Sequence, residues 1–333
     1  MHIPDGYLGP ATALATWGIM VPVWGAALRH LRKRLDVRRI PLLSLGAAFS
    51  FLVMMFNIPI PGGTTGHAVG SVLVALLLGP WAAVISVSLA LALQALLFGD
   101  GGITALGANC LTMAVVMPLA GWAVFRLTGV KAPESRRRYL AAGFAGYAGL
   151  NAAALATSVL LGMQPLLASD ASGRPLYCPY GLGVAVPVMA AEHLLLFGFV
   201  EAIVTAVALK WLDRTEPGLA ASPPASALPP RPRSLWRGIL VLLALTPLGF
   251  LLPRWAGTGA AWGEWSPEEL VVLLGYVPAR LERWAAFWRA PVPDYAEEAG
   301  PLGYLLAGAL GLAVLGVLYL GLRTVARVRG DSG

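Results

Sequence analysis

The chain has 333 residues, of which 57% are hydrophobic and 12% are charged. About a quarter of the residues of an average soluble domain are charged, so a soluble fold could not bury this much apolar surface, and lipid must solvate much of it. The net charge of +7 comes from short basic blocks between apolar runs, which is not the pattern of a nucleic-acid-binding surface. We therefore expect an all-α integral membrane protein that binds no nucleic acid.

Apolar runs of about 20 residues are needed to cross a bilayer as helices. The sequence predicts nine spans, at residues 11–28, 40–57, 67–79, 81–97, 107–127, 139–161, 183–210, 237–252 and 302–322. The stretch 68–97 is counted as two spans because one straight helix would be roughly 45 Å long, too long for a single crossing. Gly79-Pro80 in its middle favours a tight turn there. We expect the Gly/Pro-rich segment 58–63 to dip into the membrane plane, buried in protein or lining a cavity.

The basic blocks indicate the orientation, since cytoplasmic loops are rich in Lys and Arg. Four blocks follow the first, fifth, seventh and ninth spans: Arg29, Arg32, Lys33, Arg34, Arg38 and Arg39; Lys131, Arg136, Arg137 and Arg138; Lys210, Arg214, Arg231, Arg233 and Arg237; Arg323, Arg327 and Arg329. Nine spans with the N-terminus outside and the C-terminus inside place every block in the cytoplasm. We therefore expect a multi-pass protein of a prokaryotic plasma or inner membrane.

A proline-rich stretch divides the chain. We expect a membrane domain at 1–212 with seven spans, a cytoplasmic linker at 213–236, and a two-span domain at 237–333. The last domain encloses an outside loop at about 253–301, which carries seven acidic and four basic residues. Four of the five tryptophans in this loop indicate packing at the membrane interface: Trp262, Trp265, Trp284 and Trp288.

The N-terminus is a candidate metal-binding site. No basic region of a signal peptide precedes it, and the large His2 disfavours removal of Met1, so we expect Met1 to be retained. The Met1 amine, the amide nitrogen of His2 and its imidazole can then close two fused chelate rings on one metal. Ni(II) and Cu(II) favour such nitrogen-rich square-planar sites, and Co(II) can follow. His67, at the outer end of the third span, is the candidate fourth ligand, since ionisable residues at membrane depth are functional candidates by default. An exposed polar His2 and a helix-start role for His67 are the structural alternatives.

Other polar residues are weaker candidates. Gln94, Asp100 and Asn109 cluster at the outer ends of the fourth and fifth spans, where they could orient the ligating imidazoles; a turn at Asp100 and a helix cap at Asn109 are the alternatives. Within the seventh span, three residues either line the cavity or satisfy one another: Glu192, His193 and Glu201. The two cysteines, Cys110 and Cys178, have no metal-ligand spacing, and the sequence does not decide whether they pair.

Several motifs together resemble the CbiM/NikM-type substrate-specific components of energy-coupling-factor importers for cobalt and nickel. They are Met1-His-Ile-Pro-Asp-Gly-Tyr-Leu-Gly-Pro10, Pro61-Gly-Gly-Thr-Thr-Gly-His67, Leu78-Gly-Pro-Trp81, Gln94-Ala-Leu-Leu-Phe-Gly-Asp-Gly-Gly102, Thr104-Ala-Leu-Gly-Ala-Asn109, and Glu192-His193 with Glu201-Ala. The resemblance covers about residues 1–212. It implies a seven-helix bundle with an outside N-terminus, and a metal held by the Met1 amine, His2 and His67. The tail resembles, more loosely, the small CbiN/NikN-like partner fused to the same chain.

The resemblance implies a non-catalytic transporter subunit whose substrate is Co²⁺ or Ni²⁺, without an organic cofactor. Its partners would be a membrane coupling protein and two ATP-binding subunits, because the chain itself lacks GxxxxGK[ST]. One rival is an intramembrane enzyme, but no HExxH pair or nucleophile elbow is present. The other rival is a self-sufficient channel or carrier, although the acidic and histidine residues do not line a continuous polar path. Nickel and cobalt are not distinguished by the sequence.

Overall fold

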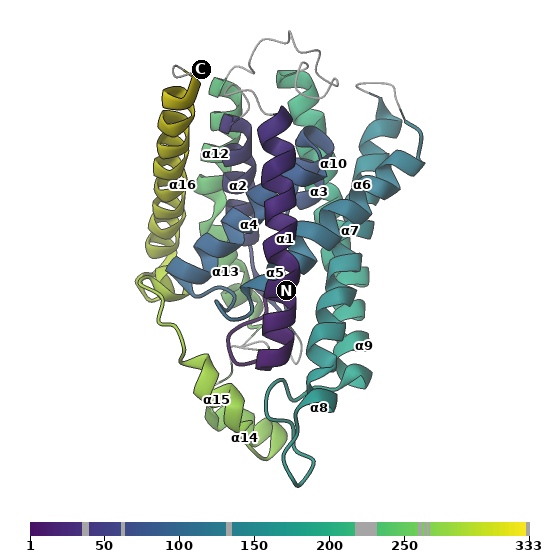
Figure 1. Ribbon diagram of the computed structural model, residues 1–333, viewed down its shortest axis with the longest axis vertical. Coiled ribbons are helices and arrows are strands. Elements are labelled where there is room, and N and C mark those ends of the chain that lie inside the picture. Colours follow the sequence, from purple (N-terminus) through teal and green to yellow (C-terminus); the bar gives the residue numbers. More distant parts are fainter. Residues whose placement is uncertain are drawn as a thin grey trace.

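The structure is a computed structural model that describes residues 1–34, 40–60, 64–130, 135–216, 232–258, 262, 265 and 267–330. The described chain is mostly helical, and its long helices run side by side along the long axis of the molecule (Figure 1). The helical fold class is confirmed. The proline-rich part of the expected linker lies outside the described residues.

The N-terminal part contains the following elements: α1 (Pro10–Arg34), α2 (Ile40–Met54), β1 (Ile58–Pro59), β2 (Thr65–Gly66), α3 (Ser71–Leu78), α4 (Pro80–Leu93), η2 (Gln94–Phe98), α5 (Leu106–Asn109), η3 (Cys110–Val116), α6 (Met117–Leu127), α7 (Arg136–Gly162), α8 (Gln164–Leu167), α9 (Leu182–Glu192), η4 (His193–Phe197) and α10 (Gly198–Thr215). The segments η2, η3 and η4 are π-helical turns inside longer helices. Such turns occur frequently at functional sites. The C-terminal part contains α12 (Pro232–Leu245), α13 (Pro247–Ala256), α14 (Pro267–Leu274), α15 (Ala279–Ala285), η5 (Pro293–Ala299) and α16 (Gly300–Gly330).

Among the described residues, seven helical stretches are long and apolar enough to cross a membrane. They are Pro10–Arg32, Pro80–Phe98, Leu106–Leu127, Arg136–Leu167, Leu182–Thr215, Leu235–Ala256 and Pro293–Gly321. Each corresponds to one of the nine predicted spans. The second predicted span corresponds to the shorter apolar helix α2, and the third to α3. The first helix is longer than predicted and continues through its basic end, where long cationic side chains can reach the polar headgroup region.

The break at Gly79-Pro80 is confirmed, since α3 ends at Leu78 and α4 begins at Pro80. However, α3 has only eight residues and rises about 12 Å, less than half of the roughly 30 Å hydrocarbon core. The chain before it is not helical. Instead, β1 and β2 form an antiparallel pair that joins Ile58 to Gly66 and Pro59 to Thr65. This hairpin was not predicted, and it determines where His67 lies.

The C-terminal part packs on the N-terminal part at one end of the molecule, at the bottom of Figure 1, where α8, α14 and α15 lie. The backbone amides of Arg280 and Leu281 both donate to the carbonyl of Leu176, at 3.0 and 3.1 Å. Two tryptophans of this part pack on Tyr180: Trp262 stacks on its ring at 4.3 Å, and Trp265 meets the same ring edge-on at 6.2 Å. The described residues between α13 and η5 therefore pack against the N-terminal helices.

Candidate metal centre

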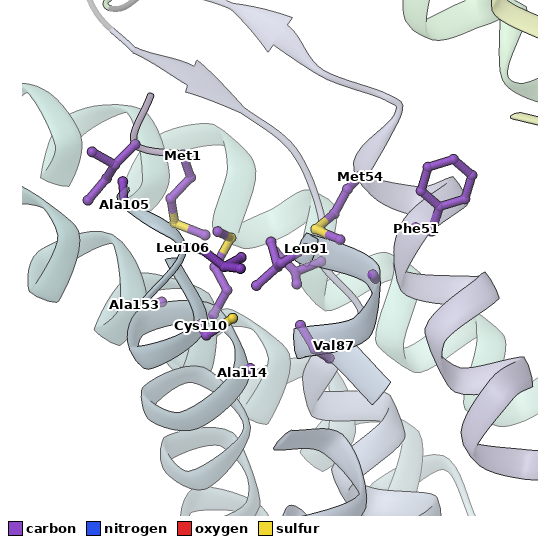
Figure 2. Close-up of a cluster of buried hydrophobic side chains, with 14 of the residues drawn as sticks. Met1, Phe51, Met54, Val87, Leu91, Ala105, Leu106, Cys110, Ala114 and Ala153 are labelled. Atoms are coloured by element: carbon purple, nitrogen blue, oxygen red, sulfur yellow. The ribbon is translucent and has the colours of Figure 1, made fainter. Parts of the chain in front are cut away.

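The N-terminal segment is buried inside the bundle. Met1 is 1% exposed and Ile3 is fully buried. Figure 2 shows the Met1 side chain among Leu106, Leu91 and other apolar side chains of the core. Burial of this side chain fixes the position of the α-amino group, because moving the amine would expose the apolar side chain again.

Residue 3 is held by hydrogen bonds on both of its backbone polar groups. The amide of Ile3 donates to Oδ1 of Asn109 at 2.8 Å, and Nδ2 of Asn109 donates to the Ile3 carbonyl at 3.0 Å. The amide of Gly102 donates to the same carbonyl at 2.9 Å. Asn109 therefore pairs with the N-terminal segment like a neighbouring strand, and does not cap a helix.

Asp5 connects the same segment to the loop after Asp100. Its carboxylate accepts from the amides of Ile103 and Thr104, at 3.1 and 2.8 Å, and from the Thr104 hydroxyl. A Cβ on Gly102 would lie 2.3 Å from the Asp5 amide nitrogen, so only glycine allows this approach. These contacts fix the position at which the N-terminal segment enters the bundle.

The β1–β2 hairpin brings Thr65 and His67 to the amine. The Met1 amine donates to the Thr65 carbonyl and lies 3.1 Å from Oγ1 of Thr65. The rings of His2 and His67 stack, with centroids 4.7 Å apart and planes inclined by 22°. Thus the three residues expected to bind metal, Met1, His2 and His67, are neighbours in the folded chain.

His67 presents a free nitrogen lone pair. Its Nδ1 lies 3.0 Å from the Ala68 carbonyl, which can only accept, so Nδ1 carries the proton. Nε2 is then the unprotonated nitrogen, and it is buried without a hydrogen-bond partner. Leaving a buried acceptor unsatisfied is costly. A bound cation would remove that cost.

Asp100 is the polar neighbour of His2. Oδ1 of Asp100 lies 2.9 Å from Nδ1 of His2, and Nε2 of Gln94 donates to Oδ2 of Asp100 at 3.2 Å. Burial alone would raise the pKa of Asp100, but the charge of His2 and hydrogen bonds from His2 and Tyr295 hold that pKa well below its ordinary value. The carboxylate is therefore ionised beside His2 at neutral pH. Gln94, Asp100 and Asn109 all contact the N-terminal segment or its direct neighbours.

The three polar residues of the seventh span do not satisfy one another. Oε1 of Glu192 accepts from the Thr64 amide at 3.1 Å. Glu201 accepts from the Val69 and Gly70 amides. Nδ1 of His193 lies 2.8 Å from the Met189 carbonyl one turn earlier. Both carboxylates therefore hold the loop around His67, whereas His193 bonds within its own helix.

Within the residues that the structure describes, no three His, Cys, Asp or Glu side chains are arranged to hold a metal ion. The expected site uses only two such side chains, and its remaining donors are the amine and an amide nitrogen. Cys110 and Cys178 are both free and buried. Neither contributes a thiol to this site.

Comparisons with known proteins show the family to which the chain belongs. A family described as "Cobalt uptake substrate-specific transmembrane region" matches residues 2–219. The chain belongs to this family. Two relatives extend the similarity to the C-terminal part. The chain is 49% identical to the fused nickel transport protein NikMN of Rhodobacter capsulatus, over 99% of this chain and 100% of the relative. It is 42% identical to the probable fused nickel transport protein LarMN of Lactiplantibacillus plantarum, over 97% and 98% of the two chains.

A solved structure supports the fold of the cobalt-uptake region. A crystal structure described as that of a truncated transition metal transporter is 49% identical, with a TM-score of 0.61, and covers 64% of this chain and 99% of the other. This member of the cobalt-uptake family is therefore a multi-pass membrane component of cobalt or nickel transport, with a fused C-terminal part. Its relatives are named as transporters, not enzymes.

Some contacts at the centre were not expected from the sequence. Thr65 binds the amine, Asp5 fixes the entry of the segment, and Tyr295 reaches Asp100 from the C-terminal part. Thr65 and Asp5 lie inside motifs typical of the cobalt-uptake family, which could have marked them. Tyr295 lies 195 positions after Asp100, and no pattern in the sequence connects the two.

Proposed function

We propose that this chain captures Ni²⁺ or Co²⁺ for import, and that four nitrogens hold the ion: the Met1 amine, the amide and imidazole of His2, and Nε2 of His67. The observation that supports this most is the meeting of the buried N-terminus with two stacked imidazoles, His2 and His67, each of which has a buried Nε2 without a hydrogen-bond partner. The Met1 amine and the His2 amide nitrogen are consecutive backbone nitrogens, so a metal bound to both closes a small chelate ring. A second ring closes through the His2 side chain.

Binding requires proton or hydrogen-bond exchange at three nitrogens: the Met1 amine, the His2 amide, which must release its proton to the solvent in order to ligate, and Nδ1 of His2. The amine has an ordinary pKa of about 7.7–8.0, so a metal can displace its proton at neutral pH. The amine then exchanges its contact with Thr65 for the metal. Ligation through Nδ1 of His2, which gives the fused chelate, requires that nitrogen to leave Asp100. The donor set suits Ni(II), and Co(II) can follow.

The proposal includes energy coupling by other polypeptides. In it, the chain is the substrate-specific component of an ATP-driven energy-coupling-factor importer, and it docks on a membrane coupling protein that carries two ATP-binding subunits. ATP hydrolysis takes place on those partners. Nickel is favoured as the substrate, because the two relatives that span the whole chain are named as nickel transport proteins.

The proposed topology has nine spans, with the N-terminus outside and the C-terminus inside. In it α2 forms the second span, and the β1–β2 hairpin together with α3 forms the third. A metal-binding membrane domain at 1–212, a cytoplasmic linker at 213–236 and a two-span domain at 237–333 complete it. This arrangement requires the N-terminus, the loop at 98–106, the loop at 163–181 and the segment 258–299 to share one side. Contacts between these four segments support it.

An insertion at residue 2 tests the function. Inserting Leu between Met1 and His2 keeps Met1, because aminopeptidase does not act before a large residue, and it moves the amine one residue away from the imidazole. We expect nickel affinity to fall by about 10-fold or more, together with the loss of uptake by cells that contain the partner ATPases.

Inserting Ala is the matched control. Met1 is then removed, and an amine is again placed one residue before the histidine, so much of the affinity should return. Equal, wild-type affinity in both insertion variants would show that binding does not require the amine to lie on the residue directly before the histidine.

A further inference from the structure

The hydroxyl of Tyr295, in the C-terminal part, reaches the carboxylate beside the metal centre. It lies 2.5 Å from Oδ2 of Asp100 and 2.7 Å from Nε2 of Gln94. The other oxygen of Asp100, Oδ1, lies 2.9 Å from Nδ1 of His2. A continuous chain of contacts therefore runs from Tyr295 through Asp100 to His2.

The position of Tyr295 is fixed on all sides. Its ring stacks on Phe98 with centroids 4.7 Å apart, and lies 5.3 Å from the ring of Tyr304 and 6.5 Å from that of Phe51. Only 5% of the residue is exposed. The hydroxyl can therefore reach Asp100 only in the direction seen here.

The backbone around Tyr295 is held in an unusual conformation. Three consecutive residues, Asp294, Tyr295 and Ala296, have φ values of 49°, 57° and 55°. Residues with a Cβ avoid this left-handed region, so it persists only where surrounding contacts require it. Those contacts are present: the amide of Val292 donates to the Leu97 carbonyl at 2.9 Å, and Nε1 of Trp288 donates to the Leu96 carbonyl at 3.1 Å.

The segment 288–295 thus lies along η2, the π-helical turn that carries Gln94 and leads to Asp100. Carbonyls in a π-helical turn are displaced from the regular helical ladder, and two of them accept bonds from this segment. The left-handed turn then directs the tyrosine hydroxyl to the carboxylate.

We propose that Tyr295 is a positioning residue for metal capture: it orients Asp100, and through Asp100 the imidazole of His2. The inference rests on the proposed function of the Met1, His2 and His67 centre. Because Tyr295 and Gln94 both hold Oδ2, Oδ1 faces Nδ1 of His2 and keeps the His2 ring stacked on that of His67 until the metal displaces the carboxylate from that nitrogen. The ring is then already beside the other ligands when the metal arrives, which lowers the cost of ordering it on binding.

This assigns a direct contribution to the C-terminal part. The region that matches the cobalt-uptake family ends at residue 219, so Tyr295 lies outside it. The fused part therefore supplies a hydroxyl that the matched region lacks. Loss of a polar neighbour of a metal ligand typically lowers metal affinity by about 10–100-fold.

Tyr295→Phe tests the proposal, with Tyr304→Phe as the matched control. Both substitutions remove one buried tyrosine hydroxyl and keep the ring in the same aromatic cluster. The Tyr304 hydroxyl donates to the Met55 carbonyl at 2.6 Å and is not bonded to Asp100. The measurement is titration of the purified full chain, tagged at its C-terminus, with a Ni(II) salt, followed by calorimetry and by the visible ligand-field absorption of the bound ion.

We expect Tyr295→Phe to weaken nickel binding by about 10-fold and to shift or broaden the ligand-field band. Tyr304→Phe should lower the unfolding temperature to a similar extent and leave the affinity and the band unchanged. Equal effects of the two substitutions on affinity would overturn the proposal, since Tyr295 would then act only through general stability.

A double-substitution cycle tests the path through Asp100. In a protein that carries Asp100→Asn, adding Tyr295→Phe should cause little further loss, because its target is already altered. Additive losses would overturn the path. If His67→Ala leaves nickel binding intact, the metal centre itself is wrong, and the role of Tyr295 fails with it. If only the tyrosine result is negative, the centre stands.

Discussion

The carboxylate of Glu201, on α10, accepts a hydrogen bond of 2.8 Å from the backbone amide of Val69. It also accepts from the amide of Gly70 at 3.1 and 3.2 Å and from the hydroxyl of Thr205 at 3.2 Å. Glu201 is fully buried. One side chain thus fixes the loop between His67 and α3, where no regular backbone partner is available.

Replacing Glu201 with Ala should therefore disturb both folding and metal binding. Each buried amide left without a partner costs about 1–3 kcal/mol, so the unfolding temperature should fall and nickel affinity should decrease as His67 loses its support. Glu201→Gln keeps one acceptor oxygen and should be milder in both measurements. An unchanged unfolding temperature for the Ala variant would contradict this role.

His67→Ala removes one of four proposed donors and should lower nickel and cobalt affinity by at least about 10-fold, as measured by calorimetry. His193→Ala is the matched comparison, because it also removes a buried imidazole whose Nδ1 is bonded to a neighbouring carbonyl. We expect it to leave the affinity close to that of the wild type. If the two substitutions weaken binding equally, His67 is not distinguished as a ligand.

Both native cysteines should be inert in the folded protein. Burial raises the pKa of the Cys178 thiol to about 12, which leaves about one thiol in 10⁵ ionised at pH 7, against a few per cent for an ordinary cysteine. Cys110 is completely buried. Ellman's reagent should detect neither thiol in detergent at neutral pH, and should detect two after denaturation. Rapid reaction in the native state, or fewer than two thiols after denaturation without reductant, would contradict the structure.

The structure places the three candidate ligands, Met1, His2 and His67, side by side, as the sequence predicted. His67 could be connected with the N-terminus because both were expected on the outer side of the membrane, and Gly79-Pro80 marked the helix break because proline interrupts a helix wherever it occurs. The β1–β2 hairpin was missed because its pairs involve short strands with two residues each. Tyr295 was missed because its partners are nearly 200 positions away and no local periodicity reports such contacts.

The proposed topology can be tested with engineered cysteines, since the native ones should not react. Arg137→Cys lies in the predicted cytoplasmic loop at 128–138, near the N-terminal end of α7. Ser172→Cys lies in an exposed turn beyond the C-terminal end of α7. In intact cells, an impermeant maleimide should label position 172 and not position 137, and opening the membrane should allow both reactions. Labelling at 137 in intact cells would contradict the nine-span arrangement.

Gly6 is where the C-terminal part contacts the N-terminal segment directly. A Cβ at this position would lie 2.6 Å from the Leu281 carbonyl oxygen and 3.0 Å from the Ala285 amide nitrogen, both backbone atoms of α15. The residue also has a φ of +86°. Gly6→Ala should therefore push α15 away from the segment that carries His2.

The control is Gly173→Ala, because Gly173 has a similar φ of +81° and open space around its Cβ position. Both substitutions impose a backbone penalty of about 1–2 kcal/mol, but only Gly6→Ala displaces α15. Trypsin cleavage after Arg280 and Arg283 should become faster in Gly6→Ala alone, and nickel affinity should fall because the N-terminal segment loses its cover. Identical cleavage rates in the two variants would show that α15 does not depend on this contact.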